Sequence, residues 1–327
     1  MATMTTSNPP VVATPRVAWP VKYVALVLIW GSSFLLMKVG LEALAPLQIA
    51  GLRVLSGALV LLGLLVARGG RLPREPRVWG HLFVCGFFLT ALPFALFATS
   101  ETRVASALAG IGNATTPIAT VLATLVILPG ERATGRRLVA VGVGFLGVVT
   151  IMQPWTAERP DLVGFAMALA GGLSYGVGWT YNRRFLAHAD LGGLSQPAAT
   201  LTTGLALLVP VVLVWAVRQP TGISALWHYD QAGRGARDWL PLACILVLGL
   251  VGTGFAYMLQ FDVVRGAGPM VGSTITYLIP VVSVLLGVLV LGESLGWAEL
   301  VGFGVVLGAA LVINAPRRGA RRPSAAR

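Results

Sequence analysis

The stretch GAGPMVGSTITYLIPVVSVLLGVLVLGE, residues 266–293, determines which fold the rest of the sequence predicts. As a helix it is long enough to cross a bilayer, and its last residue, Glu293, is its first charged one. Pro280 lies near its middle and leaves the carbonyl of Thr276 without its helical hydrogen-bond partner. In the hydrocarbon core of a membrane such an unpaired carbonyl is tolerated only where protein or a water-filled cavity covers it. We therefore expect this helix to line an internal path.

A second copy of this design lies at residues 103–131, where Pro117 leaves the carbonyl of Asn113 free. Counting back from each proline gives the same steps of four, three and four residues, which place each set on one helix face. The two sets are Ser106, Gly110 and Asn113 in the first copy and Pro269, Ser273 and Thr276 in the second. Both copies end in a Gly-Glu pair. The sequence thus contains two copies of one unit.

The composition indicates a multi-span membrane protein. Of the 327 residues 56% are hydrophobic and 11% are charged, whereas an ordinary soluble domain has about 25% charged residues. The mean hydropathy of +0.81 agrees. The formal charge of +12 does not indicate nucleic-acid binding, because the basic residues lie between apolar spans and in the tail rather than on one folded face. The expected partners are the lipid bilayer and a small-molecule substrate.

Ten apolar runs are long enough to cross the membrane as helices. They cover residues 20–41, 46–67, 78–100, 104–128, 136–153, 162–183, 194–217, 239–261, 267–291 and 296–314. The predicted fold is an all-α integral membrane protein with ten transmembrane helices in two inverted five-helix repeats. The predicted organisation is a disordered cytoplasmic tail at 1–18, the first repeat at 19–153, a linker at 154–161, the second repeat at 162–314 and a basic cytoplasmic tail at 315–327.

The distribution of Lys and Arg predicts the orientation. If the N-terminus is cytoplasmic, 17 basic residues fall on the cytoplasmic side and six on the other, which is the usual bias. Both termini are then cytoplasmic. An odd number of spans in each half makes the second half enter the membrane from the opposite side, as in many secondary transporters.

Aromatic landmarks support the two halves. Trp79 and Trp239 open the third and eighth spans, and Phe97 and Tyr257 follow eighteen residues after them. In the first and sixth spans Trp30-Gly31 aligns with Tyr175-Gly176.

These features resemble a known family. The opening stretch WGSSFLLMKVGLEALAPLQIAGLR (residues 30–53), the two proline spans ending in Gly-Glu and the two inverted halves are similar to the EamA branch of the drug/metabolite transporter superfamily, over residues 19–314. The resemblance implies an exporter of small metabolites such as amino acids, working by alternating access around a central cavity in a bacterial inner membrane, as a monomer or homodimer. The many aromatic residues make it most similar to exporters of aromatic amino acids.

Six spans carry a polar or aromatic face at helical spacing, and such faces usually turn toward the bundle. Agreement between the halves favours a cavity, although the same residues could simply pack helices together. In the first half they are Trp30, Phe34, Thr90, Phe94, Phe97, Ser106, Gly110 and Asn113. In the second half they are Tyr175, Trp179, Asn182, Thr253, Tyr257, Gln260, Ser273, Thr276 and Tyr277. Pro117 and Pro280 are the predicted hinges.

Arg53 is the one basic residue well inside a predicted span. It could bind a substrate carboxylate, or it could snorkel or bind helix carbonyls. No span carries a central Asp or Glu, so we expect no buried carboxylate to carry protons and expect transport down the solute gradient. The fifth and tenth spans carry small residues four apart, which suit helix packing or a dimer surface. They are Ala140 with Gly144, and Gly304 with Gly308.

Other functions fit less well. A membrane enzyme needs converging ionisable residues, but the three histidines are scattered and no cysteine or histidine spacing predicts a metal or cofactor site. A channel would show a filter loop or rings of charge. Transport of nucleotide sugars or sugar phosphates is the stronger alternative, because Arg53, Lys38 and Arg183 could bind anions.

Overall fold

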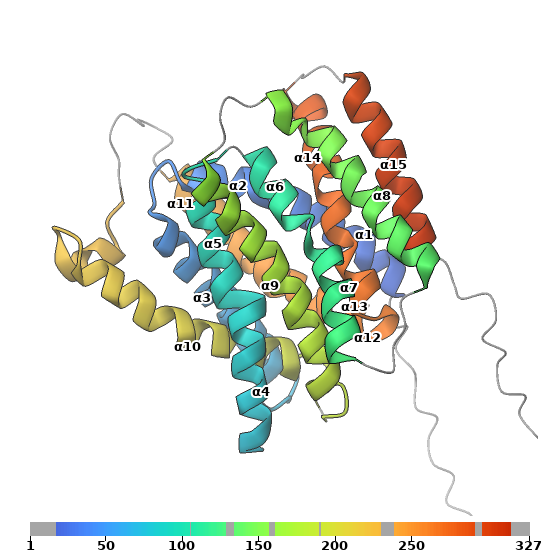
Figure 1. Ribbon diagram of the computed structural model, residues 1–327. Helices are drawn as coiled ribbons and strands as arrows, with labels where there is room; N and C mark the ends of the chain where they lie inside the picture. The colour runs from blue at the N-terminus through green and yellow to red at the C-terminus, as the bar shows by residue number, and fades with distance from the viewer. Residues whose placement is uncertain are drawn as a thin grey trace, which may run out of the picture.

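The computed structural model describes residues 18–104, 106–128, 134–156, 161–189, 191–229, 239–291 and 296–314. Within these ranges every regular element is helical, and the helices form a bundle (Figure 1). The all-α prediction is therefore confirmed for the part of the chain that the structure describes.

Seven helical segments have the length and hydropathy of membrane spans. In chain order they are α1 with α2 (Trp19–Gly31, Ser33–Gly40), α3 (Pro46–Ala67), α4 with η1 and α5 (Pro76–Gly86, Phe87–Ala91, Leu92–Ser100), α6 with α7 (Ser106–Asn113, Thr116–Ile127), α9 (Leu162–Leu186), α10 (Ser195–Val217), and α11 with η5 and α12 (Leu240–Gly249, Leu250–Phe255, Ala256–Ala267).

Three further helices stand where the fifth, ninth and tenth spans are predicted. Their apolar parts are shorter: Leu138–Met152, Pro269–Val282 and Leu300–Ile313. They belong to α8 (Gly135–Met152), α13 with α14 (Pro269–Ser273, Ile275–Leu291) and α15 (Trp297–Asn314). The prediction of ten spans is thus confirmed for seven by length and composition. Two short 3-10 turns, Pro154–Thr156 and Gly222–Leu226, lie in the connections.

Local chemistry explains several helix starts. Proline stands in the first turn of α1, α3, α4, α11 and α13, where its missing N–H removes no helical hydrogen bond. Asp161 caps α9 by accepting a hydrogen bond from the backbone N–H of Gly164 at 2.8 Å.

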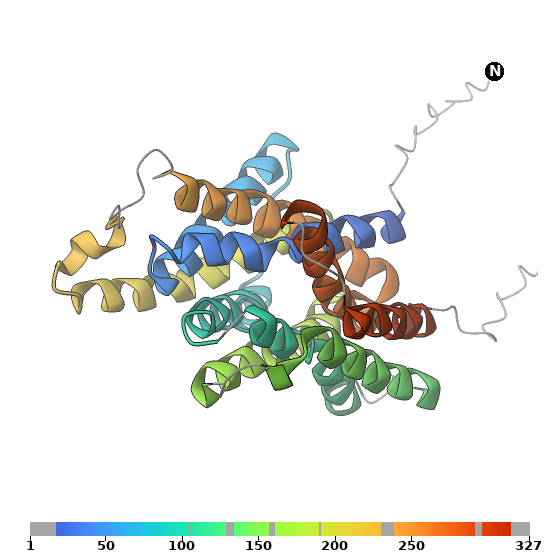
Figure 2. The same ribbon diagram turned by 90° about the horizontal axis from the view of Figure 1, so that it is seen from above.

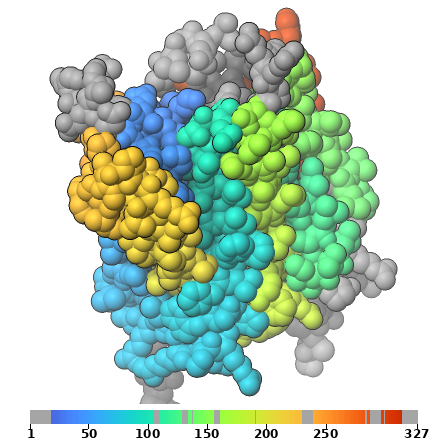
Figure 3. Space-filling model, turned by 60° about the vertical axis from the view of Figure 1, so that its left-hand side comes forward, coloured from blue at the N-terminus to red at the C-terminus, as the bar shows by residue number. Residues whose placement is uncertain are grey.

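The packing of helices repeats between the halves. Helix α1 packs against α12 and α14, and α9 packs against α5 and α7. Helix α10 crosses α3 and α4 on the outside of the bundle, where Figure 3 shows it in yellow over blue and cyan atoms. Helices α8 and α15 lie side by side along one edge (Figures 1 and 2).

Close contacts at two glycines show that the first span corresponds to the sixth. A Cβ atom on Gly31 would lie 2.4 Å from Cγ1 of Val282, and one on Gly176 would lie 2.4 Å from Cβ of Ala119. Val282 and Ala119 each stand two residues after their span's proline. This correspondence agrees with the predicted pairing of Trp30 with Tyr175.

Two other glycines show how the third span corresponds to the eighth. A Cβ atom on Gly57 of α3 would lie 2.9 Å from Cγ2 of Thr253, and one on Gly204 of α10 would lie 2.5 Å from Cγ2 of Thr90. Thr253 and Thr90 each lie on a π-helical segment of their span, η5 and η1. The two threonines are therefore equivalent.

This equivalence corrects the pairing predicted from the aromatic landmarks. The sequence pattern aligned Phe97 with Tyr257, whereas the glycine contacts align Phe94 with Tyr257, about one helical turn away. Trp79 and Trp239 caused the error. They lie at helix ends, and Trp239 is 66% exposed. Aromatic residues there are placed by the membrane surface rather than by the contacts between helices.

Two of the basic residues predicted to be cytoplasmic lie together at one end of the bundle. Lys22 of α1 and Arg265 of α12 both form ion pairs with Asp262, and Arg265 also donates to the carbonyl of Gly193 at 3.1 Å. Arg103, predicted to lie on the opposite side, pairs with Asp161 at 3.2 Å where α9 begins.

The small residues predicted to serve helix packing or a dimer surface differ in their surroundings in α8 and α15. A Cβ atom on Gly144 would lie 2.7 Å from the ring of Tyr277, and one on Gly302 would lie 2.5 Å from Cγ1 of Ile151. Gly304 and Gly308, in contrast, have no described atom within 4 Å of a built Cβ position. Helix α15 thus contacts α8 through the face that contains Gly302.

Candidate substrate cavity

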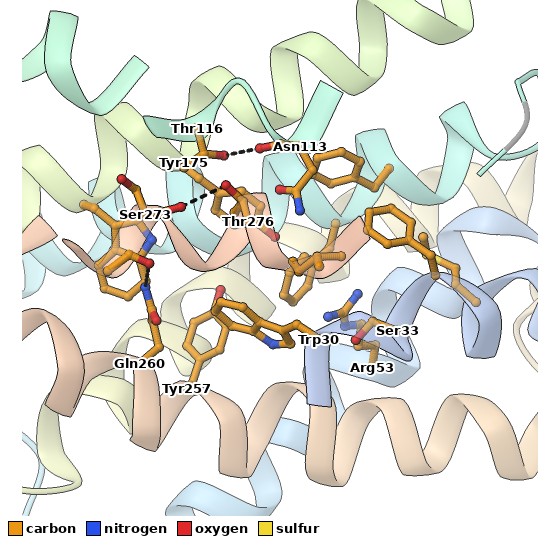
Figure 4. Close-up of a pocket in the computed structure, with 17 residues that line it drawn as sticks. Trp30, Ser33, Arg53, Asn113, Thr116, Tyr175, Tyr257, Gln260, Ser273 and Thr276 are labelled. Atoms are coloured by element: carbon orange, nitrogen blue, oxygen red, sulfur yellow. Dashed lines mark hydrogen bonds between the residues drawn. The ribbon is translucent and has the colours of Figure 1, made fainter. Parts of the chain in front are cut away.

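A cavity lies between the two halves of the bundle and contains roughly 690 Å³ of empty space, including the part open to solvent (Figure 4). Its walls come from six of the helical segments that correspond in pairs, together with α3. The lining residues are Trp30, Ser33, Phe34, Met37, Arg53, Phe94, Phe97, Asn113, Thr116, Tyr175, Trp179, Tyr257, Gln260, Gly272, Ser273, Thr276 and Ile279.

Twelve of the residues predicted to line a path do line this cavity. They are Trp30, Phe34, Arg53, Phe94, Phe97, Asn113, Tyr175, Trp179, Tyr257, Gln260, Ser273 and Thr276. Five lining residues were missed: Ser33, Met37, Thr116, Gly272 and Ile279. Thr116 and Ile279 each directly precede one of the two prolines, so the proline landmarks could have indicated them. Whether any of these residues binds a substrate stays a prediction.

Two predicted residues, Thr253 and Thr90, support the cavity from behind instead of lining it, and a third, Asn182, lies away from it. Thr253 accepts a hydrogen bond from Nε of Arg53 at 2.7 Å. The hydroxyl groups of Thr90 and Tyr257 lie 3.3 Å apart. Asn182 donates to Sγ of Cys85 at 3.8 Å, away from the lining residues.

The three remaining residues predicted to bind substrate are not among the described residues that line or support the cavity. Tyr277 is fully buried against α8, and its hydroxyl donates to the carbonyl of Val141 at 2.7 Å. A Cβ atom on Gly110 would face Met152 at 3.6 Å. Ser106 begins α6, and its side chain is outside the described part of the structure. Polar or small residues on a helix face therefore did not always indicate the cavity, because α8 and α9 contact the same helices.

Arg53 is the charged group of the cavity wall. It is 8% exposed, and its guanidinium carbon lies 4.1 Å from the centre of the Phe94 ring. Nε donates to Thr253, whereas the two terminal amino groups have no hydrogen-bond acceptor among the described residues. Arg53 therefore does not bind helix carbonyls in the described structure. A guanidinium held in this way can bind a carboxylate through its free edge (Figure 4).

Two amide oxygens complement this charge. Gln260 donates from Nε2 to the carbonyl of Gly272 at 3.3 Å, which leaves Oε1 without a partner among the described residues. Oδ1 of Asn113 is also buried without a described partner. An unpaired buried acceptor costs free energy, and a bound ammonium group would provide the missing donor.

Aromatic rings form most of the remaining wall. Phe97 lies edge-on to Phe34 and stacks on Tyr175, with ring centres 6.1 and 6.0 Å apart. Tyr257 lies edge-on to Phe94 at 6.2 Å. The indole of Trp30 donates to the carbonyl of Gly252 at 2.9 Å, which fixes this ring against the other half. Such rings suit an apolar or aromatic solute.

The helix breaks beside the cavity are satisfied by hydroxyl groups. Between α6 and α7 the carbonyl of Asn113 accepts from Oγ1 of Thr116 at 2.7 Å. Between α13 and α14 the carbonyl of Ser273 accepts from Oγ1 of Thr276 at 2.8 Å (Figure 4). Pro117 directly follows the first break, but Pro280 lies inside α14, six residues after Thr274. Break and proline therefore lie close together in the first half only, and the roles of Pro117 and Pro280 as hinges stay predictions.

A family model described as the EamA-like transporter family matches residues 19–153 and again residues 162–315. The chain belongs to this family. The two matches also show that the family unit occurs twice. Membership, together with the apolar helices, makes the chain a multi-pass membrane transporter.

Curated relatives agree with this membership. The uncharacterized inner membrane transporter YedA of Escherichia coli K12 is 25% identical over 298 residues, 89% of this chain and 88% of the relative. A probable amino-acid metabolite efflux pump of the same organism is 23% identical over 88% of this chain and 92% of its own length. Protein PecM of Dickeya dadantii is 23% identical over 88% and 89%. A protein crystal structure with 21% identity matches 90% of this chain and 95% of that chain at a TM-score of 0.67, which shows the fold.

Proposed function

We propose that this protein exports apolar and aromatic amino acids by alternating access around the cavity. The observation that carries the proposal is the arrangement of Arg53 opposite two unpaired amide oxygens, those of Asn113 and Gln260, within aromatic walls. A zwitterionic amino acid has the complementary groups: a carboxylate for the guanidinium, an ammonium for the amide oxygens and a side chain for the rings. Relatives named as probable amino-acid metabolite efflux pumps support the substrate class.

In this proposal the bundle has ten spans in two inverted repeats with both termini in the cytoplasm. The repeated glycine contacts and the gathering of Lys22, Arg265 and Asp262 at one end support it. Reporter fusions at residues 1 and 327 test the orientation, and both should report the cytoplasm. The family and the named relatives are transporters, which favours transport over catalysis.

The alternative substrate class is nucleotide sugars or sugar phosphates. These anions carry two or more negative charges, and among the described lining residues the cavity offers them one cation, Arg53. Lys38 lies outside the cavity lining, and so does Arg183. The cavity therefore fits a single carboxylate better than a pyrophosphate.

Purified protein in liposomes tests the proposal. Efflux of radiolabelled phenylalanine should exceed that of empty liposomes, and excess unlabelled tryptophan or leucine should slow it more than glutamate or a nucleotide sugar does. Trp30→Ala and Tyr175→Ala should each reduce efflux severalfold, because they remove ring contacts in the cavity. Trp227→Ala changes a ring that is 68% exposed outside the cavity, and it should behave as wild type. Transport of a nucleotide sugar without phenylalanine efflux would contradict the proposal.

A further inference from the structure

Glu101 is a buried acidic residue at the end of a predicted span. It directly follows Ser100, the last residue of α5, and is 3% exposed. Both of its carboxyl oxygens are buried and have no hydrogen-bond partner among the described residues. No predicted span carries a central Asp or Glu, so no buried carboxylate was expected to carry protons, yet Glu101 at a span end is buried.

An unpaired ionised carboxylate is costly in such a place, because burial removes its water without supplying donors. Burial raises the pKa of Glu101 to about 8, while the nearby positive charges of Lys38 and Arg53 act in the opposite direction. Burial thus favours the protonated, neutral form of Glu101 in this conformation.

The position of Glu101 connects it with the cavity. It lies four residues after Phe97 and seven after Phe94, so the three side chains share one face of the helix. Phe97 lines the cavity, and Phe94 carries the guanidinium of Arg53 on its ring. Glu101 thus continues the cavity wall toward one end of the bundle.

Few charged or titratable groups surround it. Helices α3, α9 and η1 pack against α5. From these elements Arg53 and Tyr175 face the same region, and Lys38 of α2 adds a second positive charge that acts on Glu101. The ion pair of Arg103 with Asp161 at the same end is exposed. A movement that brought Glu101 closer to Arg53, or opened it to water, would favour release of its proton.

We propose that Glu101 is the proton-binding site of the transport cycle, so that export of one amino acid is linked to inward movement of a proton. This inference rests on the proposed function. In the step itself the carboxyl O–H bond breaks, the proton passes to water on the opened side, and the carboxylate that remains is stabilised by the positive charges of Lys38 and Arg53. A proton from the other side restores the acid when the transporter has reversed.

The first experiment needs no substrate. Infrared titration of the purified protein should show the C=O band of a protonated carboxyl that disappears as the pH rises through about 8. Glu101→Gln should lack this titrating band. Asp161→Asn, which changes an exposed carboxylate at the same end, should keep it. Absence of the band from wild type, or its persistence in Glu101→Gln, would overturn the proposal.

The second experiment measures coupling in liposomes with radiolabelled phenylalanine. An imposed pH gradient should drive phenylalanine accumulation on the acidic side in wild type and Asp161→Asn, and Glu101→Gln should accumulate at least tenfold less. Glu101→Asp, which retains the acid, should keep part of the accumulation and shows that the position tolerates change. Full accumulation by Glu101→Gln would overturn the proposal. If wild type carries no phenylalanine, the proposed function fails and the infrared titration alone decides the role of Glu101.

Discussion

Arg53 in the first half and Thr200 in the second half occupy equivalent places. Each lies four residues before a glycine that contacts a threonine of the other half, Gly57 in one case and Gly204 in the other. Arg53 lines the cavity and bonds to Thr253. Thr200 is fully buried, and its hydroxyl has no partner among the described residues.

The difference between Arg53 and Thr200 shows which properties the two halves of the repeat share and which they do not. Small residues recur because both halves bring helix backbones close together, and this need is the same on each side. Among the described lining residues the positive charge occurs once, which fits a single cavity shared by the two halves. A solute with one carboxylate requires one guanidinium, and a second would add an unpaired buried charge.

Replacing Arg53 tests this difference most strongly. Arg53→Thr gives the first half the residue of the second half and removes the carboxylate contact. A hydrogen bond to a charged group contributes about 1.5–3 kcal/mol, so phenylalanine transport at low concentration should fall by roughly ten- to a hundredfold. The measurement is the initial rate of efflux from liposomes.

Arg103→Thr is the matched control, because it removes an exposed arginine that pairs with Asp161 outside the cavity. Its transport should stay near wild type. Equal losses in the two variants, with both proteins folded, would show that the position of the charge is unimportant and would remove the contrast between the halves.

Much of the fold was predictable from the sequence because apolar length and proline spacing depend on residues close in the chain. The family unit and the pairing of Trp30 with Tyr175 follow from such patterns. The third span was correctly paired with the eighth, but the residue register of this pairing was not predictable from Trp79 and Trp239, since the π-helical segments and the glycine contacts that set it involve other helices.

The residues that line the cavity were only partly predictable, again because contacts between helices do not show in the local sequence. A helix face shows which residues are buried, but not which neighbour covers them. Tyr277 has the same polar and aromatic character as Tyr257, and both hydroxyl groups donate to backbone carbonyls, those of Val141 and Leu89, yet only Tyr257 lines the cavity. Glu101 was missed because a span end predicts exposure, and only the packing around α5 shows that it is buried.

The glycine contacts provide a test of the similarity between the halves. Gly57→Ala and Gly204→Ala should both lower stability, because the added methyl group would approach Thr253 or Thr90 within 3 Å. Overpacking of this kind costs about 1–3 kcal/mol, so both variants should unfold at lower temperature in detergent, by similar amounts.

Gly63→Ala is the control in the same helix as Gly57. Its added methyl group would have no described atom within 4 Å, and alanine favours helix, so stability should be unchanged or slightly higher. A large loss at one contact glycine and none at the other would show that the two halves do not pack equivalently.

Substitution of the two prolines is expected to have the smallest effect on transport, and it tests how far the two halves differ at their helix breaks. Pro117→Ala adds an N–H directly after the break between α6 and α7, where it can compete with the hydroxyl of Thr116 for the carbonyl of Asn113. Pro280→Ala acts inside α14, more than one turn beyond the break at Thr274. The first change should therefore slow turnover by about three- to tenfold, the range of one net hydrogen bond, and the second should slow it less.

Efflux rates at saturating phenylalanine, measured beside binding affinity, separate slower turnover from weaker binding. If Pro280→Ala slowed turnover as much as Pro117→Ala, both prolines would act as hinges, and the difference between the two breaks would have no effect on transport.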